Sequence, residues 1–131
     1  MYKYSLYNLK ISSSFKMADL QETDFVRADV EIRRGGVPEK LDKATWLERF
    51  YFNNDSILYR SGQFKTCICN GHKIRLEVEG LSEETVQNHI LGFAFPLLLL
   101  QRKIVTLHGS AVQKNGETVI FCAPSGTGKS T

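Results

Sequence analysis

The sequence predicts an α+β fold with a mostly antiparallel sheet and one long, kinked helix. Three observations lead to this prediction. Apolar and polar residues alternate in several short segments, which is the period of half-buried strands. Asn70-Gly71 separates two of these segments, and both central positions of a type I′ hairpin turn need the positive φ that Asn and Gly tolerate. The uncharged run 90–100 then follows a serine that can cap a helix.

The first half of the chain is expected to form strands. The segment 2–11 begins with Tyr2, Tyr4 and Leu6 on one face, and 25–33 repeats the pattern with alternate apolar residues. The short runs that follow are separated by Gly-containing turns and indicate an antiparallel meander. The expected strands are 2–11, 25–33, 46–52, 56–60, 64–69 and 73–79.

A helix is predicted over 83–101. Ser82 is placed to cap it, and acidic residues in the first turn with basic residues after the last turn suit the helix dipole. Pro96 removes one backbone donor inside this helix, so a kink or a break into two helices is expected. Two further strands are expected at 104–112 and 118–122, joined by a loop containing Asn115-Gly116. We therefore divide the chain into a mainly β region (1–81), a core helix (82–103) and a third region (104–131).

Composition excludes several classes of protein. The 131 residues carry 17 Lys and Arg against 14 Asp and Glu, a formal charge of +3, and the basic residues are scattered. No polybasic segment therefore indicates a nucleic-acid or membrane partner. The run 90–100 is shorter than the roughly 18 apolar residues that cross a bilayer. Without a secretory leader at the N-terminus and with three cysteines, an odd number, we expect a cytoplasmic protein with free thiols.

The last nine residues match the phosphate-binding P-loop pattern, with Ala in place of the first Gly. Backbone N–H groups of such a loop point at the phosphates and form an anion-binding nest at a helix N-terminus. The expected strand 118–122 runs directly into this loop. The predicted nucleotide-binding residues are Ala123, Pro124, Ser125, Gly126, Thr127, Gly128, Lys129, Ser130 and Thr131.

Each P-loop position has a physical role. Gly126 and Gly128 let the backbone approach the phosphates, and Lys129 places a cation against the β and γ phosphates. The hydroxyl of Ser130 is expected to ligate Mg²⁺, so the predicted cofactors are ATP and Mg²⁺. The alternative is a glycine-rich turn that binds nothing, and the strand that leads into the loop favours the nucleotide site.

Other residues carry weaker signals. His108 lies on the strand expected to pair with the one that feeds the P-loop, where an imidazole can act as acid, base or phosphate contact. A histidine satisfied within the core is an equal alternative. Cys67 and Cys69 lie two residues apart and share a strand face. Because no second Cys or His pair stands at metal-ligand spacing, two buried small hydrophobes are favoured over a zinc site.

The segment Leu107-His-Gly-Ser-Ala-Val112, then Asn115-Gly116, then Val119 to Ser130, resembles the start of the HPr kinase catalytic domain. That family is similar in having a His-Gly strand fifteen residues before the first P-loop position, as His108 stands to Ala123. More loosely, the whole chain is similar to the HPr-kinase-like serine kinases of bacterial gene clusters, including those that modify peptide natural products.

The resemblance implies a phosphoenolpyruvate-carboxykinase-like P-loop domain beginning at residue 104. It also implies a Mg²⁺-dependent kinase that transfers the terminal phosphate of ATP to a seryl hydroxyl of a protein or peptide, with His108 in the active site. The family's catalytic acidic residues lie downstream of the P-loop, whereas no Asp or Glu follows Glu117 here. We therefore expect these 131 residues to be a fragment of the kinase, a truncated gene product or a degenerate copy.

Two other functions stay open. The loop from Pro124 to Thr131 also resembles that of ABC-type ATPases, although those domains place it much nearer their start than residue 123. The second alternative is a non-catalytic domain that binds a leader peptide or scaffold and keeps a vestigial P-loop. The sequence indicates neither the acceptor, nor a preference for ATP over GTP, nor the oligomeric state.

Overall fold

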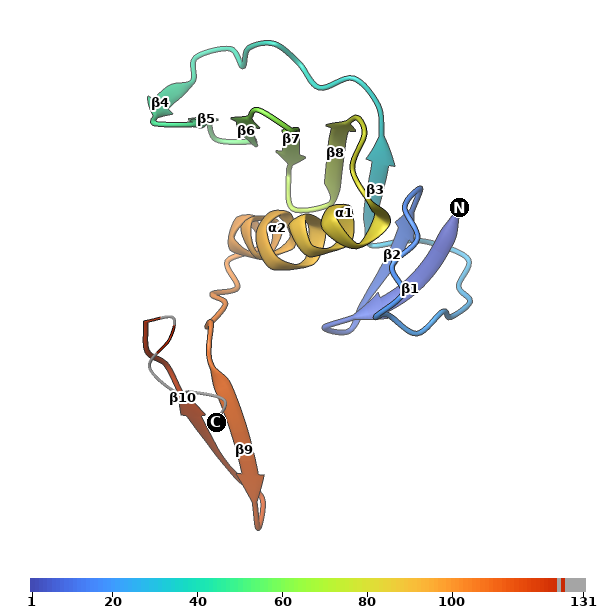
Figure 1. Cartoon of the computed structure of the whole chain (residues 1–131), viewed down its shortest axis with the longest axis vertical. Coiled ribbons are helices and arrows are strands. Elements are labelled where there is room, and N and C mark those ends of the chain that lie inside the picture. Colours follow the sequence, from blue (N-terminus) through green and yellow to red (C-terminus); the bar gives the residue numbers. More distant parts are fainter. Residues whose placement is uncertain (125, 127–131) are drawn as a thin grey trace.

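A computed structural model describes residues 1–124 and 126 of the chain. It shows an α+β architecture with a large mixed sheet, one helix of 19 residues and a separate hairpin (Figure 1). The elements are β1 (Tyr2–Leu6), β2 (Leu9–Ser13), β3 (Val30–Arg34), β4 (Thr45–Leu47), β5 (Phe50–Phe52), β6 (Ser56–Ser61), β7 (Phe64–Cys69), β8 (Lys73–Val78), α1 (Glu83–His89), η1 (Ile90–Ala94), α2 (Phe95–Gln101), β9 (Ser110–Lys114) and β10 (Glu117–Phe121).

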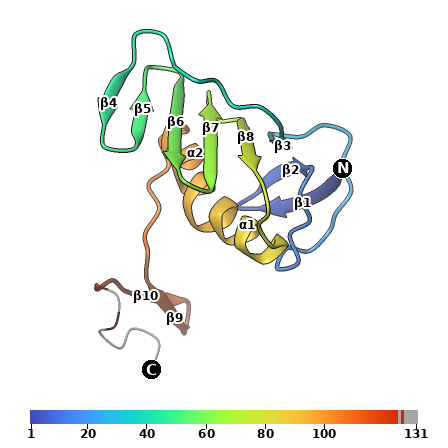
Figure 2. The ribbon, with the colours of Figure 1, turned by 45° about the horizontal axis from the view of Figure 1, so that its top comes forward.

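The large sheet has the strand order β1-β2-β3-β8-β7-β6-β5-β4, and we call this sheet together with its helix the body. The pairs β2–β3 and β3–β8 are parallel, and the other neighbouring pairs are antiparallel. After β3 the chain runs to the far edge at β4 and returns strand by strand to β8, which lies beside β3 (Figure 2). The predicted α+β class, with one long helix, is therefore confirmed.

The N-terminal segment differs from its prediction, because 2–11 forms a tight hairpin instead of one strand. Tyr7 and Asn8 both have positive φ, 51° and 62°, and they reverse the chain between β1 and β2. The alternation of apolar and polar residues continues on both sides of this two-residue turn. Tyr4 of β1 pairs with Ile11 of β2, and both are buried on the same face. Period-2 alternation alone therefore did not distinguish one strand from two.

The other strand predictions have mixed outcomes. The meander is confirmed as β6, β7 and β8, and Asn70-Gly71 adopts the two positive φ values, 52° and 66°, that the predicted turn needs. The segment 46–52 is a hairpin of β4 and β5, with Glu48 at φ 53° in its turn. The strand predicted at 25–33 begins only at Val30, because the chain before it is irregular and the Val26 side chain is fully exposed.

The predicted helix over 83–101 is confirmed as α1, η1 and α2 in continuous succession. The Ser82 hydroxyl accepts a hydrogen bond from the Thr85 N–H at 3.1 Å, so the predicted cap is present. Pro96 does not break the helix. Instead η1 is a π-helical turn, in which the Phe95 N–H donates to the Ile90 carbonyl oxygen, and this wider turn precedes the residue that lacks a donor.

The core lies between the helix and one face of the sheet. Leu98 and Ile90 of the helix are fully buried against Ile68, Ile74 and Leu76 of the strands. A smaller cluster of Val37, Leu58 and Cys67 lies on the opposite sheet face, where the segment after β3 covers it. The helix is thus part of the body and stabilises the sheet by burial of apolar area.

His89 occupies an aromatic cage at the junction of α1 and η1. Its ring stacks on Phe64 at a centroid distance of 3.9 Å, lies 4.9 Å from the Phe93 ring, and its Nε2 is 2.8 Å from the Thr66 hydroxyl. Burial among these groups lowers the pKa of His89 from 6.5 to about 4. His89 is therefore neutral near pH 7 and serves packing.

We expect the stability of the body to fall as the pH is lowered from 6.5 towards 4. In that window the unfolded chain binds a proton at His89 while the folded protein does not, so protonation favours unfolding. Urea unfolding at a series of pH values measures this. Glutamine does not titrate, so in His89→Gln the free energy of unfolding should change clearly less between pH 6.5 and 5. An unchanged pH dependence would exclude His89 as its source.

Candidate functional site

The predicted P-loop begins at Ala123, two residues after the end of β10 at Phe121. Ala123, Pro124 and Gly126 lie in the part of the chain that the structure describes, and Gly126 has φ 83°. Ser125 and residues 127–131 lie outside it, and these include the predicted phosphate lysine Lys129 and the predicted Mg²⁺ ligand Ser130. The described geometry of the candidate site is therefore that of the hairpin which leads into the loop.

The hairpin of β9 and β10 has the turn that the sequence predicts. Asn115 and Gly116 have φ of 52° and 82°, and Lys114 pairs with Glu117 across them. The strand predicted at 104–112 is wrong at its start, because β9 begins at Ser110. A two-residue turn fixes the register, so Ser110 faces Phe121, the last residue of β10.

Gly109 lies at the open end of this hairpin, beside the residues that lead into the P-loop. A Cβ at this position would lie 2.7 Å from the Phe121 carbonyl oxygen and 3.0 Å from the Cys122 sulfur. Only a residue without a side chain therefore allows this approach. His108 precedes it, exposed and outside the strand on which it was predicted. The β9–β10 pairing ends at Ser110 and Phe121, so the register does not extend to His108 and Ala123.

Gly109→Ala should loosen the junction between the hairpin and the P-loop. The new methyl group meets backbone at 2.7 Å, and such overpacking typically costs about 1–3 kcal/mol. Amide hydrogen exchange over 117–121 should accelerate by about tenfold. Gly62→Ala is the matched control, because no atom lies within 4 Å of a Cβ there. Equal exchange in Gly109→Ala and the native protein would show that the close approach is not needed.

Apolar side chains cover both faces of the hairpin and are exposed. Val112, Val119 and Phe121 share one face, Ile120 lies on the other, and each is 48–58% exposed. A hairpin of two strands is marginally stable by itself, and strands that are apolar on both sides are typical of a sheet interior. The described part of the hairpin therefore presents exposed apolar side chains on both of its faces.

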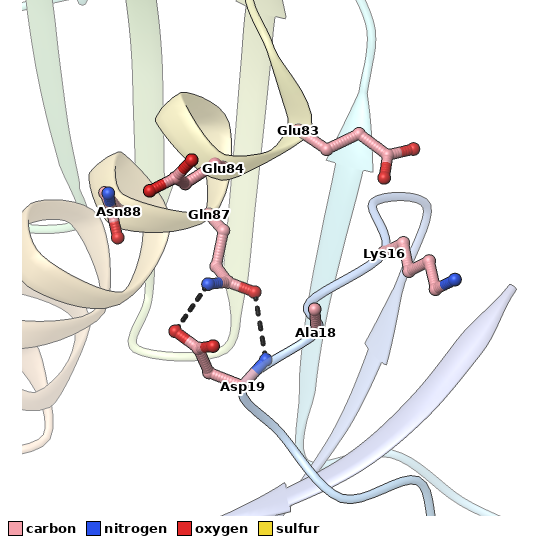
Figure 3. Close-up of a pocket in the computed structure, with 7 residues that line it drawn as sticks. All are labelled: Lys16, Ala18, Asp19, Glu83, Glu84, Gln87 and Asn88. Atoms are coloured by element: carbon pink, nitrogen blue, oxygen red, sulfur yellow. Dashed lines mark hydrogen bonds between the residues drawn. The ribbon is translucent and has the colours of Figure 1, made fainter.

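A hollow of about 430 Å³ lies on the body between the α1 helix and the segment after β2 (Figure 3). Gln87 spans it, because its amide donates to the Asp19 carboxylate at 2.7 Å and accepts from the Asp19 N–H at 3.2 Å. These two bonds fasten the crossover between β2 and β3 to the helix. Lys16, Ala18, Glu83, Glu84 and Asn88 complete the lining.

Within residues 1–124 and 126, no group of three or more His, Cys, Asp and Glu side chains could hold a metal ion. The three cysteines are free thiols, as predicted. Among the described residues, no helix has the length and apolar character needed to cross a membrane. Comparison of the chain with protein-family models, with curated proteins and with solved structures gave no match.

Proposed function

We propose that the chain supplies the P-loop of an ATP-dependent, Mg²⁺-requiring kinase that phosphorylates a seryl hydroxyl of a protein or peptide. The observation that carries this proposal is the motif Ala123 to Thr131, which begins two residues after the last strand of a tight hairpin. A strand that ends at a glycine-rich loop is the context in which the P-loop motif binds phosphate. Lys129 neutralises the β and γ phosphates, and Ser130 ligates Mg²⁺.

The hairpin supports the same proposal. The resemblance includes a His-Gly strand fifteen residues before the first P-loop position, and Gly109 of this pair closely approaches the Phe121 carbonyl oxygen. In this proposal His108, which precedes Gly109, contacts a phosphate or exchanges a proton. In this proposal β9 and β10 are interior strands of a phosphoenolpyruvate-carboxykinase-like sheet, which accounts for their apolar faces.

Phosphoryl transfer also needs a base for the acceptor hydroxyl and a further Mg²⁺ ligand. Residues 118–131 contain no Asp or Glu, so the proposal assigns neither group to the segment that carries the P-loop.

The test uses the gene product as it is translated in the cell, including residues 1–131. It is incubated with Mg²⁺ and ATP labelled at the γ phosphate, with a heat-treated extract of the producing cells as the source of acceptors. We expect acid-stable label in phosphoserine. No label should be incorporated when EDTA removes Mg²⁺ from the reaction. Release of inorganic phosphate without labelled protein would favour the ATPase alternative, and no ATP turnover would favour the vestigial P-loop.

A further inference from the structure

A pair of thiols lies on the sheet face opposite the helix. Cys67 and Cys69 are alternate residues of β7, and their sulfur atoms are 3.5 Å apart in a hydrogen bond. The sheet register places two cations beside them on β8, with Arg75 opposite Cys67 and Lys73 opposite Cys69. Directly opposed residues share a face and lie within side-chain reach, so both cations border the sulfur pair.

The two thiols differ in access. Cys67 is 3% exposed and packs with Val37 and Leu58, whereas Cys69 is half-buried. A hollow of about 260 Å³ opens beside the pair, and it is lined by Pro38, Cys67, Cys69, Asn70, His72, Lys73 and Arg75. A small molecule in this hollow therefore meets a sulfur atom and basic side chains together.

The surroundings also shift the pKa values of the two thiols in opposite directions. The hydrogen bond from Cys67, with a further one from Ser56 and the positive charges of Arg75 and Lys73, lowers the pKa of Cys69 to about 6. The same hydrogen bond and burial raise the pKa of Cys67. The surroundings thus favour the thiolate form at Cys69, the more accessible of the two sulfurs, over Cys67.

We propose that Cys69 is a site of reversible S-thiolation by a low-molecular-mass disulfide that carries carboxylates, of the glutathione type. The Cys69 thiolate attacks one sulfur of the disulfide, and a new S–S bond forms as the old one breaks. The second half leaves as a thiolate with the electron pair, so no separate oxidant is required. Lys73 and Arg75 receive the carboxylates.

The strand geometry makes this mixed disulfide the end product. Residues i and i+2 of an extended strand have Cα atoms about 6.4–6.8 Å apart, at the upper limit that a disulfide spans. Cys67 is also protonated and buried, so it attacks the mixed disulfide poorly. The adduct is therefore removed by an external thiol. This proposal does not rest on the kinase function.

The test uses glutathione disulfide with the full protein in a Cys122→Ser background, which removes the exposed third thiol. We expect one glutathionyl group on Cys69 by peptide mass mapping, reversed by dithiothreitol and absent in Cys69→Ser. At pH 6 the folded protein should react about tenfold faster than the guanidinium-unfolded chain, because its larger thiolate fraction outweighs its lower nucleophilicity. Equal rates, modification of Cys67 instead, or a Cys67–Cys69 disulfide would overturn the proposal.

A preference for anionic over cationic disulfides distinguishes a specific binding site from a thiol that is only exposed. The ratio of the rate with glutathione disulfide to the rate with cationic cystamine should fall at least about fivefold in Lys73→Gln/Arg75→Gln, because the attraction for carboxylates is lost. Lys16→Gln/Arg27→Gln removes the same charge from exposed positions and should leave the ratio unchanged. An equal fall in both double variants would contradict a role for Lys73 and Arg75.

Discussion

Lys129→Ala is expected to reduce phosphoryl transfer by the gene product at least about 100-fold. The ammonium group stands against the β and γ phosphates in a P-loop, where negative charge must be stabilised during transfer. Loss of one such preorganised electrostatic contact typically costs two to three orders of magnitude in rate. Initial rates of label transfer from γ-labelled ATP measure the effect directly.

The matched control for this variant is Lys114→Ala. Lys114 is an exposed lysine on β9, next to the turn at the hairpin end opposite the P-loop, so the substitution removes the same charge at a distance from the proposed site. It should keep transfer within about twofold, because an exposed charge outside the phosphate nest adds little. Transfer that persists in Lys129→Ala with unchanged ATP binding would refute the P-loop assignment.

Leu98→Ala is expected to destabilise the body by about 2–5 kcal/mol. Leu98 lies on α2 with no exposed surface and packs in the cluster that joins the helix to the sheet. Truncation removes apolar contacts and leaves a cavity that the surrounding side chains fill only in part. The midpoint of urea unfolding, followed by circular dichroism, reports the change.

Leu100→Ala tests whether this loss comes from burial. It is the same substitution on the same helix two residues away, but the Leu100 side chain is 55% exposed. Its effect should stay within about 0.5 kcal/mol, since exposed positions away from packing contribute little. Similar losses in the two variants would mean that the helix does not pack on the sheet through the face that carries Leu98.

Much of the body could be predicted because its signals are local. Ser82 caps the helix through its own hydroxyl, and Asn70-Gly71 provides the backbone angles of the β7–β8 turn. The parallel pairing of β2, β3 and β8 could not be predicted, because it depends on contacts between distant segments. The first hairpin was missed because Tyr7-Asn8 lacks the glycine that marks such a turn.

The candidate sites show the same division. The P-loop is a contiguous motif, so residues 123–131 can be found in the sequence without any structure. The role of Gly109 depends on its approach to Phe121 across the hairpin, and a glycine beside a histidine gives no such signal. The cations around Cys69 come from the register of β7 with β8, which places Lys73 and Arg75 beside the thiols. Alternation predicted that Cys67 and Cys69 share a face, but not what else lies on it.

The most direct test of the kinase proposal is the fate of the γ phosphate. The gene product is supplied with Mg²⁺, γ-labelled ATP and the heat-treated extract, and label in phosphoserine is counted against label in inorganic phosphate over the same time course. We predict that protein-bound phosphoserine accumulates and that Lys129→Ala abolishes it. Label that appears only as inorganic phosphate, or phosphoserine that forms equally with Lys129→Ala, would contradict the assignment.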